Sequence, residues 1–283
     1  MSVEVEHGPK QEFHLVDPSP WPACAAVSAG LLAFGLVLFM PPDLFGVDAE
    51  EFVIFMGPWA FFPGAILLCA TVALWWRDVT LEAEYGGHHT PIVQLGMRYG
   101  MALFIVSEVM FFGAFFWAFF NARLYPKETP LDVPGGVWPP EGIETLDAFD
   151  VPFLNTLILL LSGVTVTWAH HALREGHRRE MLQALGITVI LGFTFTSLQI
   201  FEYAHANFAF TDGIYASTFY MATGLHGFHV VVGTVFLAVC WYRAANDHFR
   251  PDHHFGFEAA AWYWHFVDVV WLFLFVCVYW LGG

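Results

Sequence analysis

Residues 97–120 read MRYGMALFIVSEVMFFGAFFWAFF, and this stretch decides the fold class of the chain. After Arg98 the run is apolar and aromatic, except for Ser107 and Glu108 near its middle. A helix needs about 20 such residues to cross the hydrocarbon core of a bilayer. Strands of a transmembrane β-barrel are shorter and alternate between apolar and polar residues. The continuous run therefore predicts a membrane-spanning helix.

Six further runs of this kind occur along the chain. The predicted spans lie near Trp21–Met40, Val53–Trp76, Met97–Phe120, Phe153–Ala172, Leu182–Ala204, Ser217–Tyr242 and Ala259–Leu281. Of the 283 residues, 57% are hydrophobic, 18% are aromatic and 13% are charged, whereas soluble domains carry about 25% charged residues. We therefore expect an all-α integral membrane protein with seven transmembrane helices.

The few charged residues predict an orientation. The chain has 26 acidic and 10 basic side chains and a net charge of −16, which excludes a nucleic-acid surface. Eight of the 10 Lys and Arg residues fall on the same side as the N-terminus. By the positive-inside rule this side is cytoplasmic, or faces the matrix, and the C-terminus lies outside. We expect a bacterial plasma membrane, ahead of the mitochondrial inner membrane.

The connections divide into inner and outer segments on this topology. Residues 1–20 form an N-terminal segment on the inner side, and residues 81–96 form a polar inner loop. Residues 121–152 are rich in Pro and Gly and form an irregular outer loop. Most of the excess negative charge falls on the outer side.

Glu108 is the most informative polar residue, because ionisable groups at the middle of a span are costly and need a physical reason. One interpretation is a carboxylate that exchanges protons or faces lipid headgroups. The other is a protonated carboxyl that forms a hydrogen bond to another helix. Burial alone favours neither.

Each of the last three spans carries a pair of polar residues spaced by three positions, so that the two share a helix face. The pairs are Gln199 and Glu202, His226 and His229, and His265 and Asp268. Two histidines and a carboxylate can bind iron or zinc, but this spacing is common by chance and no established metal motif accompanies it. We predict no metal site and a structural hydrogen-bond network between adjacent helices.

Several strings resemble signature sequences of cytochrome c oxidase subunit III. They are HLVDPSPWP at 14–22, RYGM at 98–101 leading into SEV at 107–109, WPP at 138–140, TWAHH at 167–171, TGLHGFH at 223–229 and FGFEAAAWYWHFVDVVW at 255–271. The resemblance runs from about residue 14 to the end, and only the stretch 41–61 departs from the pattern.

The resemblance implies a two-helix bundle in residues 21–80 and a five-helix bundle in residues 97–283, with a phospholipid-holding cleft between them. It implies no haem or copper in this chain, since these belong to partner subunits, and packing against oxidase subunits I and II. The aa3-type complex reduces dioxygen with electrons from cytochrome c and pumps protons, and this subunit supports proton uptake and stability. The acidic outer face would attract such a basic electron donor.

Carried over by position, Glu108 matches the family's intramembrane glutamate at the cleft. The positions expected near lipid headgroups, besides Glu108, are Trp76, Arg77, His89, Arg243 and His248. The residues expected to be structural are Gln199, Glu202, His226, His229, Glu258, His265 and Asp268. A different class of function, a stand-alone proton-coupled transporter that uses Glu108, is the alternative.

Overall fold

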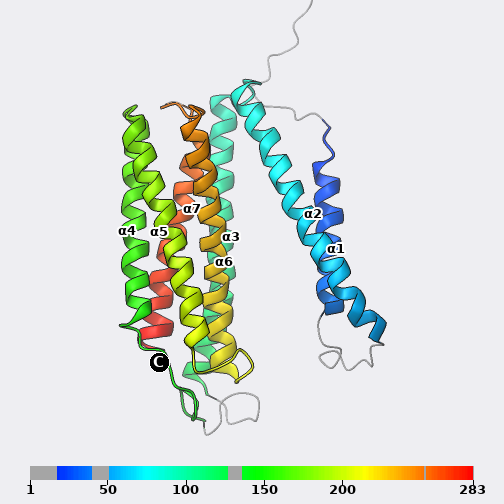
Figure 1. Ribbon diagram of the computed structural model, residues 1–283, viewed down its shortest axis with the longest axis vertical. Helices are drawn as coiled ribbons and strands as arrows, with labels where there is room; N and C mark the ends of the chain where they lie inside the picture. Colours follow the sequence, from blue (N-terminus) through cyan, green and yellow to red (C-terminus); the bar gives the residue numbers. More distant parts are fainter. Residues whose placement is uncertain (1–17, 40–50, 127–135, 252, 283) are drawn as a thin grey trace, which may run out of the picture. The chain divides into compact units, whose positions relative to one another are not determined.

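The computed structural model describes residues 18–39, 51–126, 136–251 and 253–282, without side chains for Phe39 and residues 51–56. Its helices are α1 (Trp21–Phe39), α2 (Glu51–Glu84), α3 (Pro91–Leu124), α4 (Val151–Arg174), α5 (Arg178–His205), α6 (Ile214–Ala245) and α7 (Phe255–Leu274), which continues as the π-helical segment η3 (Phe275–Trp280) (Figure 1). Within the described residues, all 7 are long and apolar enough to cross a membrane. The predicted all-α, seven-helix membrane fold is confirmed.

Helices α2 to α7 extend beyond the apolar runs that predicted them. The expected inner loop 81–96 is wrong in extent, because α2 continues to Glu84 and α3 already begins at Pro91. The last turn, Leu81–Glu84, consists of good helix formers, and Gly86 and Gly87 then end the helix. Proline suits the first turn of a helix, where its missing N–H is not needed. The length of an apolar run therefore indicates the part of a helix that crosses the hydrocarbon core, and not the full length of the helix.

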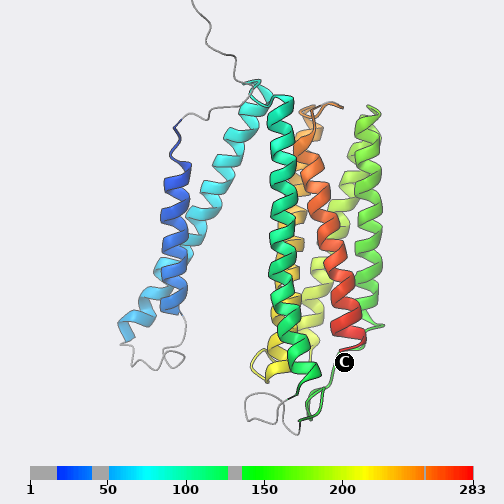
Figure 2. The same ribbon diagram turned by 180° about the vertical axis from the view of Figure 1, so that it is seen from behind.

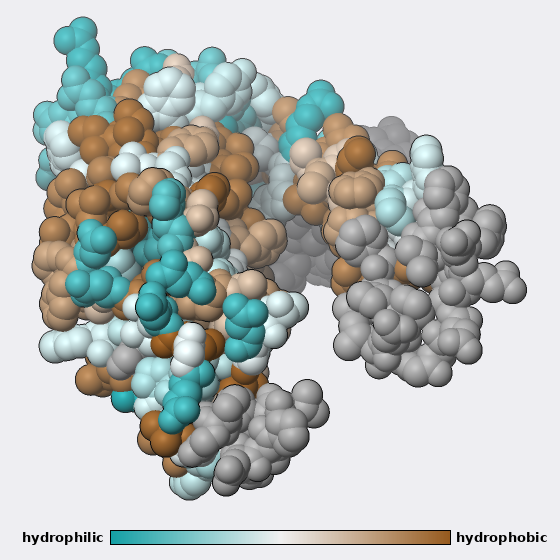
Figure 3. Space-filling model, turned by 60° about the horizontal axis from the view of Figure 1, so that its bottom comes forward, coloured by the Kyte–Doolittle hydropathy of each residue, from teal (hydrophilic) through white to brown (hydrophobic). Residues whose placement is uncertain are grey.

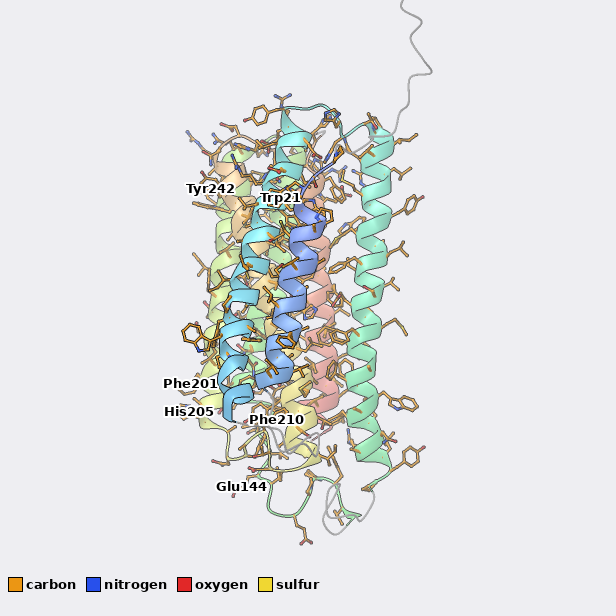
Figure 4. All side chains as sticks on the ribbon, turned by 90° about the vertical axis from the view of Figure 1, so that its right-hand side faces the viewer. Trp21, Glu144, Phe201, His205, Phe210 and Tyr242 are labelled. Atoms are coloured by element: carbon orange, nitrogen blue, oxygen red, sulfur yellow. The ribbon has the colours of Figure 1, made fainter. Side chains whose placement is uncertain are left out.

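The chain divides into two compact units, residues 1–96 and residues 97–283. In the first unit α1 packs on α2. Gly35 and Gly64 lie directly against the backbone of the facing helix, where a Cβ atom would clash. Small residues at such positions let membrane helices approach closely. The indole of Trp21 donates a hydrogen bond of 2.7 Å to Asp78 Oδ2, which joins the start of α1 to the end of α2 (Figure 4).

In the second unit α4, α5, α6 and α7 form a ring in which each helix packs on two others, and α7 lies between α3 and α4 (Figure 2). Trp264 is fully buried inside this ring, and its indole donates to Ser162 Oγ at 2.9 Å. Helix α3 joins the ring through long side chains, of which Phe112 and Phe119 are buried. The core is therefore aromatic and lies around α7.

Polar and charged residues lie at both ends of this unit. At the end formed by the α4–α5 and α6–α7 connections lie Arg174, Arg178, Arg179, Arg243 and Arg250. Figure 4 shows Tyr242 at this end, and Glu144, Phe201, His205 and Phe210 toward the opposite end. Hydrophilic residues gather on that opposite end, whereas the flank beside it is mainly hydrophobic (Figure 3). This distribution matches a unit that crosses a bilayer.

Candidate functional site

Glu108, at the middle of α3, forms a hydrogen bond across the unit to His229 on α6. The distance from Glu108 Oε2 to His229 Nε2 is 2.8 Å, and His229 Nδ1 lies 2.8 Å from the carbonyl oxygen of Leu225. The side chains are 20% and 6% exposed, respectively. The most conspicuous acid of the sequence is therefore paired with a residue far away in the chain.

The hydrogen bonds of this pair define its proton content. A carbonyl oxygen only accepts, so His229 Nδ1 carries a hydrogen that it donates to Leu225. One further proton then lies between His229 Nε2 and Glu108, either on the carboxyl group or on the ring. In both arrangements the pair is neutral overall, which suits a site at membrane depth. The pair can hold a proton and transfer it between its two partners.

Aromatic rings surround this pair. The ring centroid of Phe112 lies 5.0 Å from that of His229, and Phe266 lies at 6.0 Å. Tyr263 stacks on the imidazole with an interplanar angle of 18°. These rings exclude water from the imidazole and fix its orientation, so that mainly the Glu108 side remains open.

His226, one turn before His229, has a different partner. Its Nε2 lies 3.1 Å from the backbone oxygen of Val267 on α7, and the ring is completely buried against Phe195 and Trp271. It holds α6 against α7. The two histidines share a helix face but form hydrogen bonds to different neighbouring helices.

Gln199 and Glu202 form a second polar cluster inside the ring of helices. Gln199 Nε2 donates to Glu202 Oε1 at 3.1 Å, and the hydroxyl of Tyr279 donates to the same oxygen at 2.6 Å. Asn155 on α4 donates to Gln199 Oε1 at 3.4 Å. The cluster joins α4, α5 and η3.

The remaining predicted residues lie in two further contacts. Glu258 forms an ion pair with Arg98, with 2.9 Å between Oε2 and Nη2, and this contact ties α7 to α3. His265 Nδ1 lies 3.5 Å from Asp268 Oδ2 on the same helix. The single interhelical network that we expected is therefore divided into separate clusters, because residues on one helix face different neighbours. Within the described residues, no three His, Cys, Asp or Glu side chains converge in a way that could hold a metal ion.

The predicted lipid-contacting residues fall in both units. Trp76 and Arg77 are exposed on α2, about two turns before its end, and the backbone oxygen of His89 accepts from Gln94 in the same unit. In the other unit, the Arg243 guanidinium lies over the ring of Phe249, 4.5 Å from its centroid. His248 lies in the connection that follows α6, and its backbone N–H donates to the Arg243 carbonyl oxygen. Their roles toward lipid stay predictions.

Sequence reasoning missed the partners of the residues that it identified. Arg98, Asn155, Thr167 and Tyr279 each contact a predicted polar residue. Asn155 could have been noticed as an amide inside an apolar run. Tyr279 gave no signal, because tyrosine is an ordinary residue near the end of a membrane helix.

Comparison with known proteins identifies the relatives of the chain. The family model described as cytochrome c oxidase subunit III matches residues 11–283. Proteins named cytochrome c oxidase subunit 3 from Danio rerio and Squalus acanthias are each 54% identical over 271 residues, which cover 96% of this chain and 97% of the relative. The protein of that name from Dugong dugon is 55% identical with the same coverage.

Proposed function

Because the chain belongs to the cytochrome c oxidase subunit III family, we propose that it is an accessory subunit of an aa3-type oxidase and carries no redox centre of its own. In this role it packs on subunits I and II, which hold the haem and copper. The pairing of the buried histidines supports the proposal, since both ring nitrogens of His229 and Nε2 of His226 are engaged in hydrogen bonds within the chain.

The proposed contribution of the chain is to hold a proton in the membrane and so to support proton uptake by the complex. The observation that carries this is the Glu108–His229 hydrogen bond of 2.8 Å. A carboxyl and an imidazole with one proton between them can take up or release that proton with little rearrangement. The Glu108 side chain is 20% exposed, so the pair has an open side.

A second part of the proposal is phospholipid binding. Arg77 follows Trp76 on the exposed surface of α2, and this pattern offers a phosphate bidentate hydrogen bonds beside an apolar ring. Arg243 is in turn oriented by Phe249, which leaves its guanidinium near the end of α6 where headgroups lie.

The test of the proton role is Glu108→Gln in the assembled oxidase. Glutamine keeps a hydrogen-bonding group at the position of Oε2 but cannot release a proton. We expect normal assembly and haem content, together with a several-fold fall in proton-pumping turnover or in the number of turnovers before inactivation. Ser107→Ala is the matched control, because the Ser107 hydroxyl donates only to Phe104 of its own helix. Unchanged turnover and durability in Glu108→Gln would leave the residue with a structural role only.

The orientation and the membrane complete the proposal. The arginine-rich end of the five-helix unit is proposed to face the cytoplasm or matrix, with the C-terminus on the outer side. The sequence-based expectation was a bacterial plasma membrane, but the relatives described above are vertebrate proteins, and this weighs toward the mitochondrial inner membrane. The orientation can be tested with a single cysteine introduced at Glu175 or at Glu141 and labelled by an impermeant reagent. Labelling of Glu175→Cys from outside would show the opposite orientation.

A further inference from the structure

A polar chain of three side chains, Thr167, His265 and Asp268, lies on α4 and α7, on the flank that faces away from the other helices. It is close to the middle of both helices. His265 Nε2 is 3.2 Å from Thr167 Oγ1 on α4, and His265 Nδ1 is 3.5 Å from Asp268 Oδ2. The His265 side chain is 47% exposed, whereas that of Asp268 is 8% exposed. Gly163 makes room for Asp268, because a Cβ atom there would lie 2.5 Å from Oδ2.

The contacts of Thr167 define how His265 is held. The Thr167 hydroxyl donates its hydrogen to the carbonyl oxygen of Gly163 at 2.9 Å, so it accepts from His265 Nε2–H. His265 Nδ1 therefore faces Asp268 Oδ2 at 3.5 Å. Asp268 Oδ1 is buried without a hydrogen-bond partner among the described residues. The polar chain is thus only partly satisfied within this protein.

His265 differs from the other polar residues on the outer surface of the unit. Ser107, Thr194 and Ser197 are also exposed, but each hydroxyl donates to a carbonyl oxygen of its own helix. Such a residue needs no partner in the hydrocarbon region. The His265 imidazole instead contacts two side chains, those of Thr167 and Asp268.

The other ionisable groups at this depth are covered by protein. The side chains of Glu108 and His229 are 20% and 6% exposed, and His226 is buried. Ionisable side chains, histidine included, are rare within membrane-spanning helices and almost always face protein or a water-filled cavity. Exposure of His265 to lipid would break this rule.

Apolar and aromatic side chains surround the exposed imidazole. Val164 and Trp168 on α4 and Val269 on α7 are all exposed. Among the described residues of the unit, no helix lies in front of α4 and α7 in Figure 2. A polar centre inside an apolar, aromatic rim is typical of the core of a protein interface.

We propose that this flank, defined by Val164, Thr167, Trp168, His265 and Val269, is an interface that receives a transmembrane helix of another subunit of the oxidase. That helix covers the exposed His265 imidazole and brings a hydrogen-bonding side chain to its depth. The inference rests on the proposed function, because it requires a multi-subunit complex.

The test places a photo-crosslinking amino acid at Val269, and in a second variant at Val164, within the assembled oxidase in its native membrane. The control position is Ile190, which is 65% exposed on α5 and has Thr194 as its polar neighbour. We expect a protein adduct with the same partner subunit from positions 269 and 164, and lipid adducts from position 190. Mass spectrometry identifies the adducts.

Each result separates the interface from the proposed function. Lipid adducts alone at both flank positions, or a cross-link to a second copy of this chain, would overturn the interface while the oxidase remains intact. If the unsubstituted chain purified without haem, copper and other subunits, the proposed function itself would fail. As a second readout, His265→Leu should lower the detergent concentration at which the chain leaves the complex, and Thr194→Leu should not. Equal detergent resistance of the two variants would also overturn the interface.

Discussion

Replacing Gly233 with alanine tests the close packing of α6 on α7. A Cβ atom at this position would lie 2.8 Å from Trp264 Cε3 and 3.2 Å from Tyr263 Cε1. Trp264 has no space to move away, because it is fully buried and a Cβ atom at Gly192 on α5 would lie 2.9 Å from the same ring. We expect the free energy of unfolding to fall by about 1–3 kcal/mol, the usual cost of overpacking a core.

Gly224→Ala is the matched control on the same helix. No atom lies within 4 Å of its Cβ position, and alanine in a helix interior is favoured over glycine by up to about 1 kcal/mol. This substitution should therefore leave stability unchanged or raise it. The difference between the two variants isolates the contact with Trp264 from the effect of helix propensity.

A double-mutant cycle with Trp264→Leu completes the test. Leucine lacks the outer ring atoms that the new methyl group of Gly233→Ala would meet, so the two changes should compensate each other. Trp264→Leu alone should cost about 2–4 kcal/mol, because large-to-small changes in a core leave a cavity. Ser162 Oγ loses the indole N–H but keeps its own bond of 2.6 Å to the Leu159 carbonyl oxygen. In the leucine background, Gly233→Ala should cost little or should stabilise.

The assay is unfolding of the chain in mixed micelles with rising mole fraction of SDS, followed by far-ultraviolet circular dichroism. Additive losses in the double variant, or an unchanged midpoint for Gly233→Ala, would refute the contact between α6 and the Trp264 ring.

Two further predictions concern the polar cluster and the outer face. Tyr279→Phe removes the hydroxyl that donates to Glu202 at 2.6 Å. The free energy of unfolding should fall by about 1–3 kcal/mol, because a buried acceptor loses its shortest hydrogen bond. The same unfolding assay checks this with Tyr242→Phe, at an exposed position, as the control, and equal midpoints for the two variants would contradict it. Neutralising Glu141, Glu144 and Asp132, of which Asp132 lies outside the described residues, should weaken the salt dependence of the on-rate for a basic electron donor such as cytochrome c. Stopped-flow measurement at several ionic strengths tests it, and an unchanged salt dependence would remove this face from the docking of the donor.

The helices were predictable because a single physical requirement determines them. A segment that spans the bilayer needs about 20 apolar residues and must form all its backbone hydrogen bonds internally. Apolar runs of that length are directly visible in the sequence. Their ends were less predictable. Helix α2 continues through Asp78 and Glu84, and charged residues that extend a helix into the headgroup region look like a loop in a hydropathy pattern.

The local polar pairs were predictable to the extent that the helix geometry itself makes them. Gln199 and Glu202 are hydrogen-bonded, and His265 and Asp268 lie in contact, as a spacing of three residues favours. His226 and His229 have the same spacing but bind α7 and α3 instead of each other. Their partners depend on how α6 is rotated between its neighbours, and no local pattern contains that rotation.

The two acids at the middle of their helices illustrate the functional consequence. Asp268 has its histidine three residues away on the same helix, so this pair exists wherever α7 is helical. Glu108 has its histidine 121 residues away, so this pair exists only while α3 lies against α6. Helix α3 is held there by long side chains such as Phe112 and by the ion pair of Arg98 with Glu258. A small displacement of α3 would therefore separate Glu108 from His229 without unfolding any helix, so the pair reports directly on the packing of α3 against α6.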